Sequence, residues 1–252
     1  MRSHTSCYLR AVKISIVVPA FNEEKLLGET LAQIKSAAGA LTKIGWDTEL
    51  IVCDNHSTDH TADIARAAGA TVVFEPVNQI ARARNAGAAA ATGDLLVFVD
   101  ADTHPSAGLF ADMAEAIQSG DCIAGSAIFR WDKKTFSIVV WMPLLNIGFR
   151  WRQMFLGPFV FVERMAFQKL GGFNPEVFAG EELELCGQLK QLAGEMGKRL
   201  VILHRHPVLT SARRFAEYSA LTPLNVLFHI IFKPHAFTTS REAARRWYDG
   251  RR

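Results

Sequence analysis

The chain has 252 residues, of which 49% are hydrophobic and 21% are charged, so it is long and apolar enough to fold around a substantial core. Its formal net charge of +3 is too small to indicate a nucleic-acid partner. The four cysteines are widely spaced without a C-x-x-C pair, which argues against a zinc site or a disulfide scaffold and favours a reducing, cytoplasmic location.

The first hundred residues alternate between short apolar runs and segments of helical periodicity. Four apolar runs predict strands, at residues 14–20, 48–54, 71–76 and 94–100. The segments between them predict helices, at 22–41 with Asn22 as its N-cap, 57–70 and 79–92. Strands and helices that alternate through short connections are typical of a parallel sheet covered on both faces. We therefore predict an α/β fold with a mostly parallel central sheet.

The regular alternation changes after residue 107. The later segments predict helices at 107–120 and 181–197 and strands at 122–131 and 198–210. One more segment, 157–173, predicts a strand that runs into a helix ended by Gly171. We expect a front half that binds a nucleotide and a back half that handles another substrate.

Two apolar runs flanked by basic residues lie at 136–149 and 221–232. Each is shorter than the roughly 18 to 20 apolar residues that a membrane-spanning helix needs. They can be buried core with solvated flanks, or a surface that lies among lipid headgroups. The sequence leaves both interpretations open, so a peripheral position on the inner face of a membrane is one expected location.

Polar side chains follow three of the predicted strands. The first strand ends in Pro19 to Glu23, the second in Asp54 to Ser57, and the fourth in Asp100-Ala101-Asp102. Ligands of open parallel sheets bind beyond the carboxyl ends of the strands. Because these three clusters should meet at one edge of the sheet, we predict a ligand site there.

The ligand site lacks both common phosphate-binding motifs. The turn after the first strand, VPAFNEE, has no glycine, and no G-x-x-x-x-G-K-[ST] sequence occurs. A divalent metal held by carboxylates can grip a diphosphate instead. In an extended segment Asp100 and Asp102 would point the same way and address one Mg²⁺ or Mn²⁺ ion. A D-x-D sequence by itself is more often a solvated turn.

Four segments of the chain stand out as a set: ISIVVPAFNEE, IVCDNHSTDHT, ARARNAGAAAATGDLLVFVDAD and GGFNPEVFAGEELELCGQL. Together they resemble the family 2 glycosyltransferases, which have the GT-A fold. The resemblance runs from about Ile14 to Arg214. It implies a Rossmann-like sheet and an inverting enzyme that moves a sugar from a nucleotide-diphospho-sugar, such as a UDP- or GDP-sugar, to an acceptor hydroxyl with Mg²⁺ or Mn²⁺. The chain is then a single domain with a nucleotide-sugar half (14–107), an acceptor half (108–214) and a basic, apolar tail (215–252).

The resemblance also implies a role for each matching position. The residues assigned to the nucleotide-sugar are Pro19, Phe21, Glu23, Asp54, Arg84, Asn85, Asp100 and Ala101. The first three would line the base and ribose pocket, and the fourth would hydrogen-bond the base or ribose. The next two would lie beside the nucleotide and its phosphates, and the last two beside the ribose and metal.

The resemblance assigns the chemistry to two carboxylates. Asp102 would be the direct metal ligand, and Glu182 the general base. The base removes a proton from the acceptor hydroxyl as it attacks the anomeric carbon, while the metal and nearby cations stabilise the departing diphosphate.

Further residues are candidates from their own chemistry. Arg213 and Arg214 can clamp a diphosphate or an anionic acceptor, or form a basic surface patch. His204 and His206 alternate on a predicted strand, so only one can face the site; His206 is the candidate third metal ligand.

Several assigned residues have ordinary structural alternatives. Glu23, Glu181 and Glu182 can complement helix N-termini, Asp54 can be a turn or cap residue, and Arg84 can lie on a solvated helix face.

The sequence departs from the family pattern at two landmarks. The usual acidic pair after the second strand is Asp54-Asn55, followed by His56 where glycine is common. The usual Glu-Asp pair is Glu181-Glu182, which lengthens the base by one methylene. The Q-x-x-R-W signature of polymerising members is absent after Glu182, which favours a single transfer.

Three other functions compete with this interpretation. A catalytically inactive nucleotide-sugar-binding module would keep the pocket, and a peripheral membrane adaptor would use the apolar runs. A sugar-phosphate nucleotidyltransferase is disfavoured because the loop after the first strand is acidic. A lipid-linked or membrane-proximal acceptor is the preferred expectation, and a homodimer is left open.

Overall fold

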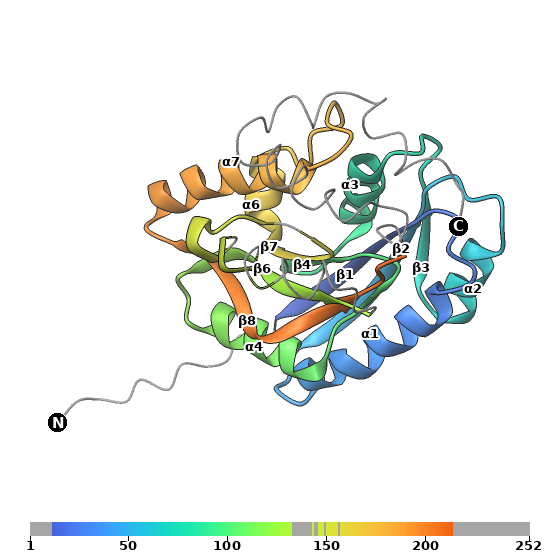
Figure 1. Cartoon of the computed structure of the whole chain (residues 1–252), viewed down its shortest axis with the longest axis horizontal. Coiled ribbons are helices and arrows are strands. Elements are labelled where there is room, and N and C mark those ends of the chain that lie inside the picture. The colour runs from blue at the N-terminus through green and yellow to red at the C-terminus, as the bar shows by residue number, and fades with distance from the viewer. Residues whose placement is uncertain (1–11, 133–142, 144–145, 149, 156, 214–252) are drawn as a thin grey trace.

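The computed structural model describes residues 12–132, 143, 146–148, 150–155 and 157–213. Within these residues eight strands form one sheet in the order β3-β2-β1-β4-β7-β6-β8-β5. Figure 1 shows α1 and α4 on one face of the sheet and α3, α6 and α7 on the other. The predicted α/β class, with helices on both faces, is therefore confirmed.

The first half of the chain forms the parallel side of the sheet. Its strands are β1 (Lys13–Ala20), β2 (Asp47–Asp54), β3 (Thr71–Phe74) and β4 (Leu95–Val99). Its helices are α1 (Leu27–Thr42), α2 (Thr61–Ala67) and α3 (Ile80–Ala90). β1 pairs in parallel with both β2 and β4, and β2 pairs in parallel with β3. All four predicted strands are confirmed.

The second half extends the sheet in mixed directions. Its strands are β5 (Thr103–His104), β6 (Cys122–Trp131), β7 (Phe159–Glu163) and β8 (Arg199–Thr210). Its helices are α4 (Ala107–Gln118), α6 (Arg164–Lys169) and α7 (Glu181–Met196). β7 runs antiparallel to β4 and β6, and β8 runs parallel to β6. The end of β8 therefore lies at the same sheet edge as the ends of β1, β2 and β4.

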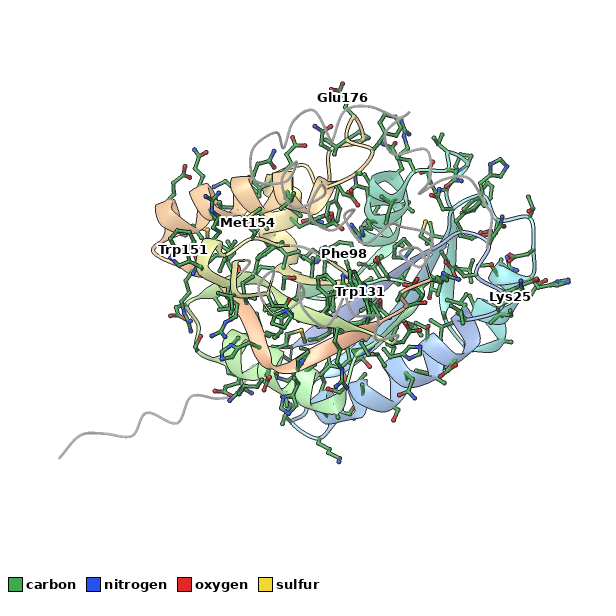
Figure 2. All side chains as sticks on the ribbon, in the orientation of Figure 1. Lys25, Phe98, Trp131, Trp151, Met154 and Glu176 are labelled. Carbon is green, nitrogen blue, oxygen red and sulfur yellow. The ribbon has the colours of Figure 1, made fainter. Side chains whose placement is uncertain are left out.

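Alternation along the strands builds a core on each face. Ile14, Ile16 and Val18 of β1 join one cluster of buried residues with α1 and α4, whereas Val17 joins a second cluster with α3, α6 and α7. Figure 2 places Phe98 of β4 in the interior, and that side chain belongs to the second cluster. Each such buried apolar side chain contributes roughly 1.5–3 kcal/mol to folding.

The small residues of α3 let this helix approach the sheet closely. A Cβ atom built on Gly87 would lie 2.4 Å from Cγ1 of Val17 on β1. A larger residue at this position would push α3 outward. The close packing fixes the helix that carries Arg84 and Asn85 against the centre of the sheet.

The predicted start of the first helix is wrong. The helix begins at Leu27, and Asn22, predicted as its N-cap, has a positive φ of 51°. Its Oδ1 accepts a hydrogen bond from the backbone N of Thr58 at 2.9 Å, so it binds the neighbouring loop. The backbone N of Glu23 likewise donates to Oγ1 of Thr61 at 2.8 Å. These bonds hold the loop after β1 to the loop after β2.

Several predictions concern residues that the structure does not describe. All of the run at 221–232 and the tail at 215–252, and most of the run at 136–149, lie outside the described residues. Whether the runs are core or membrane surface stays a prediction, as does the division of the chain into halves. In the part that is described, every helix is too short or too polar to cross a membrane.

Candidate active site

Buried polar side chains gather at the carboxyl ends of β1, β2 and β4. Asp54 at the end of β2 is buried, and so are Glu23 after β1 and Asp102 after β4. The first turn of α7 and the residues after β8 reach the same edge, where they add Glu181 and Arg213. This edge was predicted from the strand ends.

Arg84 of α3 lies beneath three carboxylates. Its Nη1 donates to Oε1 of Glu181 at 2.7 Å and to Oε1 of Glu182 at 2.8 Å. Its Nη2 donates to Oδ1 of Asp100 at 2.9 Å. Burial opposes the charge of the guanidinium, but Glu182, Asp100 and Glu181 together raise its pKa above the ordinary value. Arg84 therefore stays charged and binds the end of β4 to the start of α7.

Glu181 is the deepest of the three carboxylates. Its side chain is only 3% exposed. Burial, together with the negative charge of Glu182, raises the pKa of Glu181 to about 8, although Arg84 acts in the opposite direction. Near neutral pH the Glu181 carboxyl therefore holds a proton for much of the time.

Arg213 makes a second cluster beside the first. Its Nη2 donates to the Glu23 carboxylate and lies 3.2 Å from Oδ2 of Asp102. Burial opposes its charge, but the hydrogen bond that Arg213 donates to Glu23 and the negative charges of Glu23 and Asp102 raise its pKa. The backbone N of Ser211 also donates to the carbonyl O of Asp102 at 3.2 Å, which holds the end of β8 against the turn after β4.

The two clusters together carry excess negative charge. Their five carboxyl groups surround two guanidinium groups. Three negative charges remain when every carboxyl is ionised, and two remain while Glu181 holds its proton. Oxygen-rich, negatively charged sites suit Mg²⁺ and Mn²⁺. The negative charge of this edge therefore suits a divalent cation, although the described side chains do not converge on one point as a formed metal site. Asp100 and Asp102 stay the predicted ligands.

The turn after β4 differs from the extended segment that was predicted. The backbone N of Thr103 donates to the carbonyl O of Asp100 at 3.1 Å, so residues 100–103 form a turn. Asp100 and Asp102 therefore do not point the same way by strand alternation. Their carboxylates meet different arginines, Arg84 and Arg213. The expectation of two parallel carboxylates is wrong, because the turn's hydrogen bond replaces the strand geometry.

A family model described as glycosyl transferase family 2 matches residues 15–170 of the chain. The chain belongs to this family. An uncharacterized glycosyltransferase of Mycobacterium tuberculosis is 35% identical over 113 residues, which is 44% of this chain and 47% of that relative. The match thus spans about half the length of the relative.

Solved structures show the same fold. One is a mannosyltransferase from Pyrobaculum calidifontis in complex with GDP-Man and Mn²⁺. It superimposes with a TM-score of 0.65 at 20% sequence identity, and the match covers 96% of this chain and 74% of the mannosyltransferase chain. Glucosyl-3-phosphoglycerate synthase from M. tuberculosis, in complex with Mn²⁺, UDP-glucose and phosphoglyceric acid, has a TM-score of 0.53 at 24% identity, with 79% and 71% covered. The predicted GT-A fold is confirmed.

One departure from the family 2 pattern has a structural reason. Asn55 stands where the family usually has an acidic residue, and its amide uses both of its ends. Nδ2 donates to the carbonyl O of Val77 at 2.6 Å, while Oδ1 accepts from the backbone N of Gln79 at 2.8 Å. A carboxylate cannot donate, so only an amide satisfies this loop. Asp54 beside it accepts from the backbone N of Ser57 at 3.0 Å.

His206, the predicted third metal ligand, contacts α4 in this structure. Its Nδ1 lies 3.0 Å from Oδ2 of Asp112 on α4, and a Cβ on Gly108 would touch its ring. Across the described ranges, no three His, Cys, Asp or Glu side chains gather as a metal site. The structure therefore does not bring His206 together with Asp100 and Asp102, and its role as a ligand stays a prediction.

The remaining predicted nucleotide residues occupy varied positions. Asn85 pairs with the backbone of Phe173, donating at 2.7 Å and accepting at 2.9 Å, and so ties α3 to the loop before α7. Pro19 and Ala101 are buried at the ends of β1 and β4, and Phe21 is partly buried. Arg214 lies outside the described residues. Nucleotide contacts at these positions stay predictions.

Three residues that shape the site carry no clear signal in the sequence. Gln79 is buried and donates through Nε2 to the carbonyl O of Pro175 at 2.5 Å, which joins the start of α3 to the loop before α7. Phe173 lies under the Arg84 guanidinium, 5.3 Å from ring centroid to Cζ. Glu181 was open to interpretation as a first-turn charge, whereas its carboxylate is buried.

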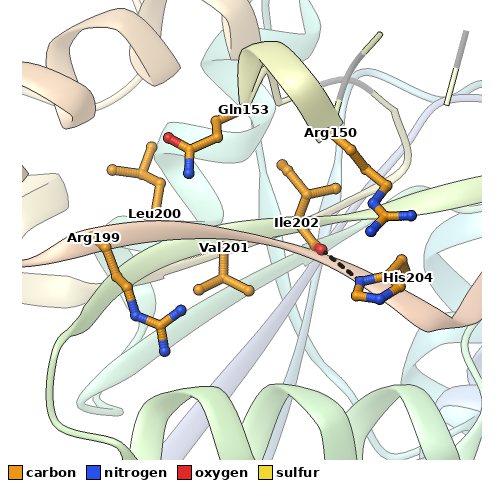
Figure 3. Close-up of a pocket in the computed structure, with 7 residues that line it drawn as sticks. All are labelled: Arg150, Gln153, Arg199, Leu200, Val201, Ile202 and His204. Carbon is orange, nitrogen blue, oxygen red and sulfur yellow. Dashed lines mark hydrogen bonds between the residues drawn. The ribbon is translucent and has the colours of Figure 1, made fainter. Parts of the chain in front are cut away.

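A separate pocket of about 220 Å³ lies in the predicted acceptor half (Figure 3). It is lined by Arg150, Gln153, Arg199, Leu200, Val201, Ile202 and His204. The carbonyl O of Gln153 accepts a hydrogen bond from the Cys186 thiol at 3.2 Å. Because Cys186 lies one helical turn after Glu182, this bond connects the wall of the pocket to the helix that carries the predicted base.

Proposed function

We propose that the protein transfers one sugar from a nucleotide-diphospho-sugar to an acceptor hydroxyl, with inversion and with Mg²⁺ or Mn²⁺. One observation carries the proposal. In a family 2 fold, Glu182 and Asp100 share one buried guanidinium at the sheet edge where ligands bind. This arrangement puts a partly exposed carboxylate from the acceptor half beside a carboxylate from the donor half.

Glu182 is the proposed general base. Its side chain is 13% exposed, so it keeps contact with the space above the sheet edge while Arg84 holds one of its oxygens. A carboxylate in this position can take the proton of an acceptor hydroxyl as the hydroxyl attacks the anomeric carbon. A single attack at that carbon from the side opposite the leaving group inverts its configuration.

Asp102 and Asp100 are the proposed metal-holding residues. A bound divalent cation would neutralise the charge that develops on the departing diphosphate. Asp54, Phe21 and Glu23 are proposed to bind the base and ribose from the loops after β2 and β1. The likeness to proteins crystallised with GDP-Man or UDP-glucose and Mn²⁺ supports a donor of this class.

The acceptor is proposed more broadly, as a hydroxyl compound near a membrane surface. Only the basic-flanked apolar runs of the sequence support this location. An inactive nucleotide-sugar-binding module would share the donor site, so Glu182→Gln separates the alternatives. The enzyme loses turnover in this variant and keeps donor binding, whereas a module has no turnover to lose.

A thermal-shift screen tests the donor site. UDP-, GDP- and dTDP-sugars are added with and without Mn²⁺, because a ligand that binds only the folded state raises the melting temperature. We expect one nucleotide to shift the transition only with Mn²⁺, and Asp102→Ala to abolish the shift. A chain that responds to none of these ligands, or a shift that survives Asp102→Ala, contradicts the proposal.

A further inference from the structure

We propose that Arg84 is a positioning residue: it holds the base Glu182 and the metal-side Asp100 at a fixed separation, and it does not bind the donor. This inference rests on the proposed function, because it assigns a role within the same site. It differs from the expectation that Arg84 lies beside the phosphates.

The geometry of the guanidinium supports a positioning role. The two Nη atoms lie in one rigid plane and point to carboxylates from two elements, Glu182 at the start of α7 and Asp100 after β4. Charge-assisted bonds of 2.8 and 2.9 Å leave little freedom in either direction. Arg84 thus links the carboxylate of the acceptor side to the carboxylate of the donor side.

The burial of Arg84 argues against direct contact with a diphosphate. The side chain is 2% exposed, although a solvated helix face was one sequence-based alternative. One face of the guanidinium lies toward Phe173, and Nε is buried without a hydrogen-bond partner among the described residues. The carboxylate of Asp100, which accepts from Nη2 of Arg84, is 23% exposed and is therefore more open to solvent than the guanidinium is. A phosphate would have to displace a carboxylate to reach the guanidinium.

Glu181 also holds the Arg84 guanidinium in place. Its carboxyl accepts from the same Nη1 that binds Glu182, so it holds the guanidinium from the buried side. Arg84 is therefore fixed between Glu181 and Phe173, and it can impose its own position on Glu182 and Asp100. A helix packed as closely as α3 provides a rigid base for this contact.

The test compares Arg84→Lys with the matched control Arg82→Lys. Arg82 is an exposed arginine on the same helix, two residues earlier. Lysine keeps the charge of Arg84 but loses the planar fork, so it cannot hold the carboxylates in the same geometry. For each protein, kcat and KM are measured for release of nucleoside diphosphate from the donor found by the screen, and the Kd of UDP or GDP with Mn²⁺ is measured by calorimetry.

We expect Arg84→Lys to lower kcat by about 100-fold or more, because a misplaced base loses the aligned geometry of attack. The donor KM and the nucleotide Kd should change by less than about 3-fold, because Asp102, the proposed direct metal ligand, keeps its contact with Arg213 in this variant. Arg82→Lys should match the wild type. A nucleotide Kd that weakens in step with kcat would show that Arg84 contacts the donor, and it would overturn the proposal.

Two further measurements keep the test decisive. If Arg84→Lys does not fold, Phe173→Leu is the second variant, because it removes the ring beneath the guanidinium. Its kcat should fall by about 10-fold at constant KM, and an unchanged kcat would overturn the proposal.

If no nucleotide binds the wild type, the proposed function fails, but ligand-free crystal structures still test Arg84. The Glu182 and Asp100 carboxylates should move apart in Arg84→Lys, and unmoved carboxylates would overturn the positioning role.

Discussion

Two arginines of this protein meet several acidic groups, in very different surroundings. Arg84 is 2% exposed and binds three carboxylates at the carboxyl edge of the sheet. Arg205 on β8 is 53% exposed, and it binds Asp112 at 2.8 Å and also the carboxylate of Glu115, both on α4. Both arginines form guanidinium–carboxylate pairs, so the difference in what these pairs contribute to stability comes from their surroundings.

The clusters around Arg84 and Arg205 differ in their exposure to solvent. Water and salt screen the exposed pair of Arg205 with Glu115, and the buried Asp112 keeps His206 as a second partner, so loss of the Arg205 contacts should cost little stability. The cluster around Arg84 is desolvated, which makes each contact stronger and each unpaired charge costly. Hydrophobic side chains would fill the same volume without the free-energy cost of removing charged groups from water. We therefore propose that the protein keeps these charges buried at a ligand-binding edge because they serve its chemistry.

Removal of the Arg84 charge should have the largest effect. Arg84→Met leaves Glu181, Glu182 and Asp100 without their shared cation, and breaking a buried ion cluster in this way costs roughly 3–5 kcal/mol. Urea unfolding followed by circular dichroism measures the change in the free energy of unfolding. A variant as stable as the wild type would mean that the cluster is no more costly to break than a surface pair.

Removal of the base should affect the reaction and leave the fold intact. Glu182→Gln keeps the size and one hydrogen-bond acceptor for Arg84 but cannot take a proton, so turnover should fall by about 10² to 10⁴-fold. Nucleotide binding with Mn²⁺ should change little. The assay is release of nucleoside diphosphate, with calorimetry beside it. Turnover equal to that of the wild type would exclude Glu182 as the base.

The buried proton of Glu181 should make stability depend on pH. Its folded pKa is raised to about 8 from an ordinary 4.5, so the folded state binds this proton more tightly than the unfolded state does. The stabilising contribution is complete below pH 4.5 and is lost as the pH rises through about 8. Glu181→Gln has no such proton.

The measurement for Glu181 is the difference in unfolding free energy between wild type and Glu181→Gln across this pH range. The wild type should lose stability relative to the variant as the pH rises from 4.5 to 8. A difference that stays constant, or that moves in the opposite direction, would mean that the carboxyl is ionised in the folded state.

Disruption of the exposed cluster should have the smallest effect. Arg205→Gln should lower the melting temperature by less than about 2 °C at low salt, because His206 remains beside the buried Asp112, and the difference should shrink at high salt because the pair with Glu115 is exposed and screened. Differential scanning calorimetry at two NaCl concentrations measures both values. A larger, salt-independent loss would remove the contrast between the two arginines.

The sequence predicted what depends on apolar periodicity and little of what depends on particular side-chain contacts. The strands at 14–20 and 94–100 are apolar runs between clear boundaries, so their positions and shared edge followed directly. β5 escaped notice because it is a two-residue strand formed only by pairing with Leu209 and Thr210. No local pattern encodes such a pairing.

The site was predicted at the level of its location. Glu182 and Asp100 were both named, but their common bond to Arg84 joins residues 98 and 16 positions apart. Only the packing of α3 and α7 on one face of the sheet brings them together. The turn at residues 100–103 was named only as the alternative to an extended segment, because a D-x-D sequence after a strand fits both geometries.

The central claim is that Asp102 binds a metal at the acidic edge of the sheet, while Arg84 holds the carboxylates of Glu182 and Asp100 in place. Anomalous X-ray scattering from crystals grown with Mn²⁺ and the nucleotide found by the screen tests it most directly. We expect a manganese peak within bonding distance of the Asp102 carboxylate, with Arg84 still bound to Glu182 and Asp100. A nucleotide bound with no manganese at Asp102, or a peak at another part of the molecule, would contradict the account.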